Sequence, residues 1–292
     1  MLGYLLFSGV TTGALYALVA LGIVVVFKAT AIVNFAHGEL FMIGGFLAYT
    51  LHVMLGVPYV LSLALAVGLT FGVGIMTDRI AFRPLMKSNI VALVLATVGF
   101  SFILKGIGRS IWGGKGDYLP FPPLVGFEPI ILPFDIVIVP QQLVVLIGAL
   151  LVMAVFAAFF RLTRIGKMMQ ATADNPKAAT LVGIRTDRVY MLTFAVGGAT
   201  AAAAAALMAP LTLLYPDIGF ALFIKGFAAA VLGGLTSLPG AVLGGICVGV
   251  IEALAGGYIH SSFLDVSAFV VIMAVLVLKP TGLLGGQRLR RV

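Results

Sequence analysis

The chain has 292 residues, of which 62% are hydrophobic and 10% are charged. Soluble domains have about a quarter of their residues charged, so this composition excludes a water-soluble globular protein. The formal charge of +8 comes from basic residues in short loops beside apolar segments, where they act as orientation signals. No basic face with interleaved aromatic residues is present, so we expect no nucleic-acid partner. Residues 1–292 are predicted to form a single transmembrane domain.

About 20 apolar residues are needed to cross the hydrocarbon core as a helix, and such segments recur along the whole chain. They predict an all-α fold, a polytopic transmembrane helix bundle in which some segments are broken or re-entrant. Eight and nine hydrophobic segments are equally compatible with the pattern. The nine are 5–27, 35–55, 58–78, 90–111, 142–160, 189–214, 221–236, 240–257 and 264–279.

The second segment opens with three polar residues, Asn34, His37 and Glu39. A charge buried in hydrocarbon is costly and usually faces the bundle interior or water, so one hypothesis places these residues along a translocation path or gate. The other places Glu39 at the membrane interface, stabilised by the dipole of the helix that it begins. Glu252 is a second carboxylate within an apolar segment.

Lysines and glycines also predict how the segments are placed. Lys28 and Lys225 are interpreted as anchors whose amines reach the interface from span ends. Glycines four residues apart predict close helix contacts, and the pairs are Gly9 with Gly13, Gly68 with Gly72, Gly240 with Gly244, and Gly245 with Gly249. We expect Gly233, Gly234 and Gly240 at tight contacts around a broken segment near the path. Paired glycines at 44–45 and 233–234 indicate a faint internal repeat.

Basic residues cluster at 79–87, 161–188 and 279–291, which we place on the cytoplasmic side. The proline-rich connection 112–141 is then external. In the loop 161–188, Asn175 and Pro176 are typical of an N-cap and a first helical residue, and Gly183 of a helix end. A short helix is therefore predicted at 176–182. This loop is either an ordinary connection or, as its length favours, a docking surface for a soluble partner.

Enzymatic motifs are missing. The sequence contains no GxSxG nucleophile elbow, no HExxH zinc motif and no phosphate-binding loop, and Cys247 is its only cysteine. We therefore expect neither catalysis nor ATP hydrolysis by this chain, and no metal or cofactor. The alternatives left open are an intramembrane enzyme and a secondary transporter or channel, although paired intramembrane charges for ion coupling are scarce.

Four stretches resemble the LivH-type permeases of bacterial branched-chain amino acid ABC transporters. They run through residues 34–42 (NFAHGELFM), 163–184, 228–241 (AAAVLGGLTSLPGA) and 279–285 (KPTGLLG). Their order matches the family over essentially the full chain. Thr236 stands where relatives commonly have glycine, and Lys28 precedes a segment that is more often neutral; both departures leave the substrate open.

The resemblance implies an ABC importer permease in the bacterial cytoplasmic (inner) membrane, with branched-chain amino acids as the expected substrate and urea, short amides or other amino acids as alternatives. Its implied partners are a second, LivM-type permease, two ATP-binding subunits that hold the ATP, and a periplasmic substrate-binding protein. The family's ATPase-coupling loop corresponds here to Gly166, Ala171, Asp174, Asn175, Pro176, Ala178, Ala179 and Gly183.

Overall fold

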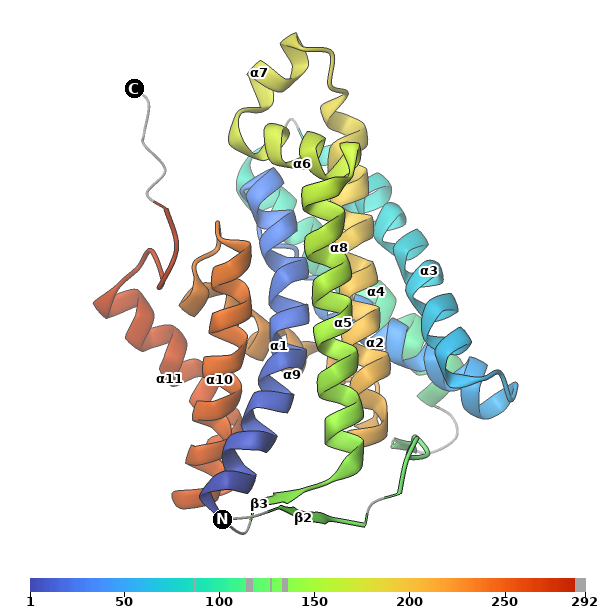
Figure 1. Cartoon of the computed structure of the whole chain (residues 1–292). Coiled ribbons are helices and arrows are strands. Elements are labelled where there is room, and N and C mark those ends of the chain that lie inside the picture. The colour runs from blue at the N-terminus through green and yellow to red at the C-terminus, as the bar shows by residue number, and fades with distance from the viewer. Residues whose placement is uncertain (87, 114–117, 127, 133–135, 287–292) are drawn as a thin grey trace.

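The computed structural model describes residues 1–86, 88–113, 118–126, 128–132 and 136–286. Each of the nine predicted segments corresponds to a helix (Figure 1). These helices are α1 (Leu2–Thr30), α2 (His37–Tyr49), α3 (Tyr59–Thr77), α4 (Ile90–Trp112), α5 (Pro140–Leu162), α8 (Thr186–Met208), α9 (Ile218–Gly233), α10 (Leu238–Tyr258) and α11 (Phe263–Leu278). Six helical stretches, all but those of α2, α9 and α11, are long and apolar enough to cross a membrane.

Short elements complete the chain. A π-helical turn, η1 (Thr50–Met54), extends α2, while η2 (Asp78–Phe82) and η3 (Arg83–Leu85) extend α3. A further turn, η5 (Ala209–Leu211), follows α8, and the loop helices are α6 (Arg164–Asp174) and α7 (Pro176–Leu181). Two small antiparallel pairs join β1 (Leu119–Pro120) to β4 (Leu213–Leu214) and β2 (Ile130–Leu132) to β3 (Ile136–Ile138).

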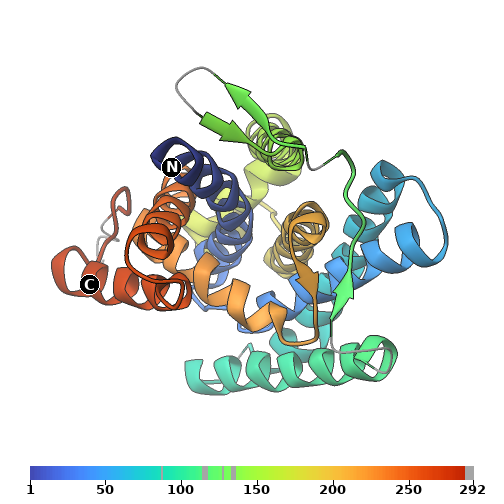
Figure 2. The ribbon, with the colours of Figure 1, turned by 90° about the horizontal axis from the view of Figure 1, so that it is seen from below.

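The centre of the bundle is formed by α1 and α8. In their most apolar windows 83% and 72% of the residues are buried, against 22% in α4. Small side chains let helices approach closely within a membrane, and the alanines at 201–206 leave α8 thin enough for such packing. By contrast, α4 lies along one edge of the bundle (Figure 2).

Two sets of four helices repeat the same packing in opposite orientation. The repeat relates α1 to α8, α2 to α9, α3 to α10 and α4 to α11. The contact of α1 with α10 thus corresponds to that of α8 with α3, that of α2 with α8 to that of α9 with α1, and that of α2 with α4 to that of α9 with α11. In Figure 1, α1 rises from the N-terminus toward α6 and α7, whereas α8 descends from that side. The helices α1–α4 and α8–α11 therefore form an inverted repeat, an arrangement common in transporters.

This repeat differs from the one indicated by the paired glycines. Gly44 packs against Ala202 of α8, whereas Gly233 packs against Gly240 of α10. The repeat relates α2 to α9 as whole helices, so the glycine pairs are not equivalent positions.

Most of the predicted glycine contacts are present. Gly9 and Gly13 of α1 lie against Gly249 and Gly245 of α10, so closely that a β-carbon on any of them would overlap backbone. Gly244 likewise contacts the backbone of α9. Within the described part of this chain, Gly68 and Gly72 make no such contact, since no atom lies near their β-carbon positions. The spacing identifies a small-residue face, but not the direction in which it points.

Candidate functional site

The first turns of α2 and α9 meet inside the bundle. After α1 ends, Ala31 adopts a left-handed conformation (φ 60°) and the chain turns back, so that the His37 ring lies against Gly22 in the interior of α1. The segment at 35–55 therefore becomes helical only inside the bundle and continues to the opposite side, so it is broken, one of the two predicted possibilities. Gly38 of α2 and Gly219 of α9 touch backbone to backbone, and a β-carbon on either would overlap the other's carbonyl oxygen.

Glu39 lies at this meeting point and is only 2% exposed. Its Oε1 accepts a long hydrogen bond of 3.5 Å from Ser101 Oγ of α4, while Oε2 is buried with no hydrogen-bond partner among the described residues. The two helix starts place partial positive charge beside this carboxylate. Glu39 thus begins a helix, as one hypothesis holds, but inside the protein rather than at the membrane interface.

Asn34 and His37, which precede Glu39 in the sequence, are also buried and incompletely satisfied. Asn34 Oδ1 accepts the Ala36 N–H at 3.1 Å, but Asn34 Nδ2 and both ring nitrogens of His37 have no partner in the part of the chain that the structure describes. Buried polar side chains are satisfied in the large majority of cases. Three such residues occur between positions 34 and 39.

A polar stripe on α4 faces α2 and was not predicted from the sequence. It consists of Thr97, Ser101, Lys105 and Arg109, four residues apart and thus on one helix face. Three hydrogen bonds join α4 to α2 and its flanks: Phe35 N–H to Thr97 at 3.3 Å, Ser101 to Glu39 at 3.5 Å, and Trp112 Nε1 to Thr50 at 2.8 Å. All three join residues 62 positions apart, so the two helices run parallel in one register.

The stripe leads outward to Asp217, the residue before α9. Asp217 contacts Lys105 Nζ at 2.8 Å and Arg109 at 2.7 Å, and the hydrogen bonds from these two cations lower the pKa of the Asp217 carboxyl. A cavity of about 420 Å³ lies here, lined by Arg109, Gly113, Tyr118, Tyr215, Pro216 and Asp217. Charged groups therefore continue from this cavity toward Glu39.

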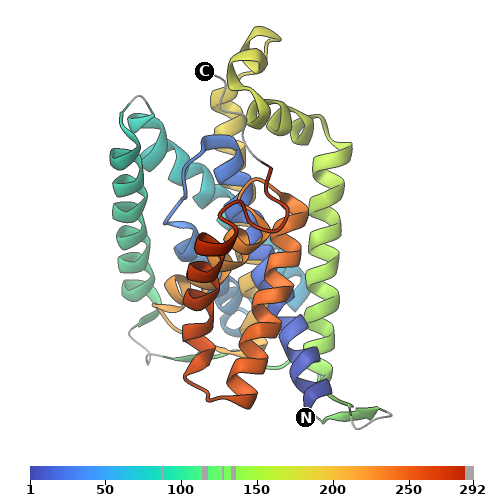
Figure 3. The ribbon, with the colours of Figure 1, turned by 90° about the vertical axis from the view of Figure 1, so that its left-hand side faces the viewer.

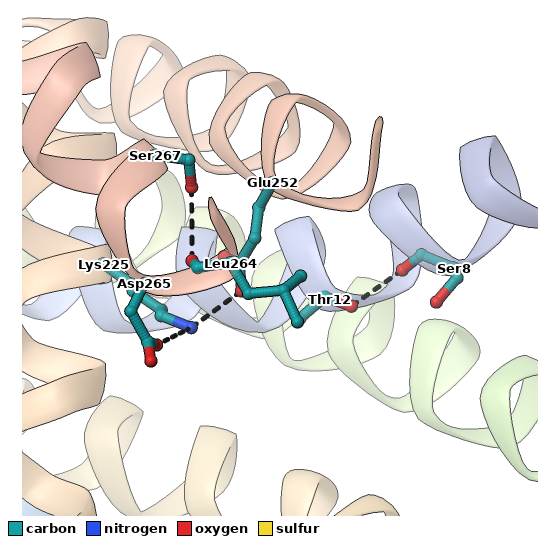
Figure 4. A network of polar contacts seen from close by, with 7 residues as sticks. All are labelled: Ser8, Thr12, Lys225, Glu252, Leu264, Asp265 and Ser267. Atoms are coloured by element: carbon teal, nitrogen blue, oxygen red, sulfur yellow. Dashed lines mark hydrogen bonds and ion pairs between the residues drawn. The ribbon is translucent and has the colours of Figure 1, made fainter. Parts of the chain in front are cut away.

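A second charged cluster lies between α9, α10 and α11. Figure 4 shows the Lys225 amine between two carboxylates, with Nζ 2.7 Å from Glu252 and 3.4 Å from Asp265. The same amine lies 5.9 Å from the centre of the Tyr16 ring. The expectation that Lys225 lies at a span end is wrong: it lies within α9, and its side chain is 14% exposed and paired with the buried Glu252 as well as the exposed Asp265. Lys28, at the end of α1, lies 3.7 Å from Asp174.

Gly233, Gly234 and Gly240 form tight contacts at the other end of α9. Gly233 packs on Gly240, and Gly234 (φ 104°) packs on Gly285 of the C-terminal segment 279–285. The N–H groups of Leu283 and Leu284 donate to the last carbonyls of α9, at 2.7 and 3.0 Å, so two of the family-like stretches contact each other. Fourteen residues of helix, roughly 21 Å, separate these contacts from Gly219. The structure does not bring the glycines together with Asn34, His37 and Glu39.

The loop helices have the predicted caps. Asn175 accepts the Ala178 N–H at 3.0 Å, Pro176 is the first residue of α7, and Gly183 has φ 84°. The helix predicted at 176–182 covers Pro176–Leu181. Thr163 caps α6 through the Gly166 N–H, and Gly166 packs on the backbone of α5. Ala179 is buried, whereas Ala171, Asp174 and Ala178 are exposed.

The end of α7 projects beyond the bundle, on the side where the described chain ends (Figure 3). Leu181 and Val182 are 88% and 77% exposed there. The loop 161–188 also carries basic residues. Exposed apolar side chains rimmed by polar residues are typical of interaction surfaces.

Comparison with known proteins gives matches over nearly the whole chain. Residues 5–278 match the family described as branched-chain amino acid transport system / permease component. The chain is 36% identical to the high-affinity branched-chain amino acid transport system permease protein LivH of Salmonella typhimurium, over 98% of this chain and 96% of that protein. It is 35% identical to the corresponding protein BraD of Pseudomonas aeruginosa, over 98% and 97%.

Proposed function

The chain belongs to the branched-chain amino acid transport permease family, and from this membership we propose that it is the LivH-type half of an importer for leucine, isoleucine and valine. It is a multi-pass membrane permease component and not an enzyme. The observation that carries the substrate proposal is the similarity, over nearly the full length of both chains, to permeases named for branched-chain amino acids.

The proposed complex contains this chain, a LivM-type permease, two ATP-binding subunits and a periplasmic binding protein, in the bacterial inner membrane. ATP is bound by the partner subunits, and this chain needs no cofactor. The capped helix α7 and the exposed Leu181 and Val182 support docking of an ATPase at the α6–α7 surface. In this arrangement the opposite end of the bundle, with β1 to β4, faces the binding protein.

Uptake measurements test the substrate. The complete complex is expressed in bacteria that lack their own branched-chain amino acid importers, and entry of radiolabelled leucine is measured. We expect saturable uptake that isoleucine and valine compete for, and that disappears when the ATPase is inactivated. Uptake of urea or acetamide without leucine would show that the substrate assignment is wrong.

Cysteine labelling tests the coupling surface. Cys247 is first replaced by serine, and single cysteines are then placed at the exposed Ala171 and Ala178. We expect a membrane-impermeant maleimide to label both only from the cytoplasmic side, and much less when the ATPase is bound. Asn175→Ala removes the cap of α7 and costs about 1 kcal/mol of helix stability, so it should lower leucine uptake per ATP hydrolysed. Labelling from outside would refute this orientation.

A further inference from the structure

We propose that Glu39, at the meeting point of α2 and α9, binds the α-ammonium group of the amino acid during its passage through this subunit. The inference rests on the proposed function, because it assumes an amino acid substrate. It adds a binding residue, a route to it and the part of the substrate that it recognises.

The carboxylate is buried but incompletely paired. Glu39 is 2% exposed, its Oε2 has no partner among the described residues, and its single hydrogen bond is 3.5 Å long. Removing a charged group from water costs several kcal/mol unless other groups replace the lost hydration. Glu252 also has one oxygen without a partner among the described residues, but its other oxygen lies 2.7 Å from a lysine amine. A primary ammonium group has the charge and the donors that Glu39 lacks.

A route of exchangeable charges connects Glu39 with the external cavity. Asp217 and Arg109 are 50% and 59% exposed, and ion pairs of that exposure contribute only about 0.2–1 kcal/mol. A zwitterion can therefore separate Arg109 from Asp217 at little cost, with its carboxylate on Arg109 and its ammonium on Asp217; Lys105, the next cation along the stripe, is 20% exposed. From Lys105, one helical turn along the stripe leads to Ser101 and Glu39.

The surroundings of Glu39 also suit the side chain and the carboxylate of an apolar amino acid. Phe35 and Phe223 form an aromatic pair with ring centres 5.5 Å apart, and Phe223 lies beside Gly38 at the meeting of the two helices. This pair offers an apolar surface for a branched side chain. The start of α9 at Gly219 supplies backbone N–H groups and a positive dipole end for the carboxylate.

A purely structural role for Glu39 leads to a different expectation. Under that reading the carboxylate is needed only to stabilise the two helix starts. Glu39→Gln would then change the amount of folded complex, but not the contact of each complex with the substrate. The decisive measurement is therefore substrate contact per assembled complex.

The experiment uses the full complex in nanodiscs with its binding protein, and a leucine analogue with a photoreactive diazirine in its side chain. Labelling is induced during turnover and mapped by mass spectrometry. In the wild type we expect labelled peptides that contain residues 35–46 or 218–227. E39Q should reduce this labelling at least tenfold per complex, while labelling of the binding protein is unchanged. E39D should retain part of it.

The matched control is E252Q, which changes another buried carboxylate, one that already has a lysine partner. It should lower the yield of complex and leave labelling per complex unchanged. Equal labelling in E39Q and wild type, or wild-type labelling confined to other segments, would overturn the proposal. Leucine uptake by the wild type is measured in parallel: its absence would refute the proposed function, whereas normal uptake with labelling independent of Glu39 would refute only this inference.

Discussion

Two helices that begin at the same point inside the bundle, α2 and α9, are fixed by different means. Over its length α9 has three polar anchors: Asp217 pairs with α4, Lys225 pairs with α10 and α11, and its last carbonyls accept N–H groups from the C-terminal segment. At its start α2 has Asn34, His37 and Glu39, each with a polar atom that has no partner among the described residues. The inverted repeat therefore pairs a helix held by ion pairs with one that is held by hydrogen bonds and has three residues with unpartnered polar atoms.

The difference indicates a division of labour between the two halves. Buried polar groups that are fully paired rigidify a structure, whereas unpaired ones are retained at a cost. We infer that α9 acts as the fixed wall of the site and that α2 presents the groups that meet the substrate. The following experiments challenge this contrast, beginning with the largest expected effect.

Gly38→Leu and Gly219→Leu each remove the contact that both helices share. The added side chain would have to occupy the other helix's backbone, so the cost should exceed the roughly 1–3 kcal/mol of ordinary overpacking, and no folded chain should be recovered. Fluorescence-detected size exclusion of the tagged chain measures this. Gly99→Leu, whose β-carbon position is open, is the control; normal recovery of either test variant would mean that the helix starts are not in contact.

Lys225→Ala should destabilise the protein by about 3–5 kcal/mol, because it leaves the Glu252 carboxylate buried without its lysine. The double variant Lys225→Met with Glu252→Gln should recover much of this loss. Glu39→Gln in α2 should cost about 1 kcal/mol or less, because it removes only dipole stabilisation. Thermal unfolding in nanodiscs compares the stability of the three variants. Equal losses of stability for Lys225→Ala and Glu39→Gln would show that α9 is not anchored more firmly than α2.

Truncation after Thr281 should loosen the far end of α9 alone. It removes the N–H donors of Leu283 and Leu284, and a buried carbonyl left unpaired costs about 1–3 kcal/mol. Hydrogen exchange should become faster in peptides covering residues 228–234 and stay unchanged in those covering 37–49. Truncation after Gly286, which spares both donors, serves as the control. Unchanged exchange at 228–234 would show that the C-terminal segment does not anchor α9.

Asp217→Asn should have the smallest effect. Ion pairing lowers the pKa of Asp217 in the folded protein, so its contribution is present above the pKa of the unfolded chain and is lost as pH falls through the folded pKa. The half-exposed pair contributes less than about 1 kcal/mol. Unfolding curves from neutral to acidic pH should therefore be slightly flatter for Asp217→Asn than for the wild type. An unaltered slope for Asp217→Asn would mean that this anchor is absent.

Much of the fold follows from local sequence. Hydrophobic length located nine helices, and the capping properties of Asn175 and Pro176 located α7, because both depend on neighbouring residues. Lys225 was misplaced because its partners come from other helices, and Glu252 is 27 positions away. Because α9 starts inside the protein, Lys225 lies near the start of the predicted segment 221–236 without lying near a membrane surface.

The candidate site was only partly predictable for the same reason. Asn34, His37 and Glu39 are conspicuous as polar residues before an apolar run, but which side of α4 faces them depends on the packing of the bundle. The spacing of Thr97, Ser101, Lys105 and Arg109 was the available signal: four polar residues at intervals of four in an otherwise apolar helix.

The constant offset of 62 residues between α4 and α2 gives this helix pair the geometry of a ratchet. Because the stripe repeats every four residues, sliding α4 by four residues, about 6 Å, would replace each residue of the stripe by the next one along. Ser101 would then stand opposite the Phe35 N–H, and the Lys105 ammonium opposite Glu39, where the Ser101 hydroxyl now lies. In the present register the Glu39 carboxylate faces the neutral Ser101 hydroxyl, and in the shifted register it would face the positive Lys105 ammonium. Paired cysteines at Phe35 with Thr97 or Ser101 would distinguish them by which disulfide forms.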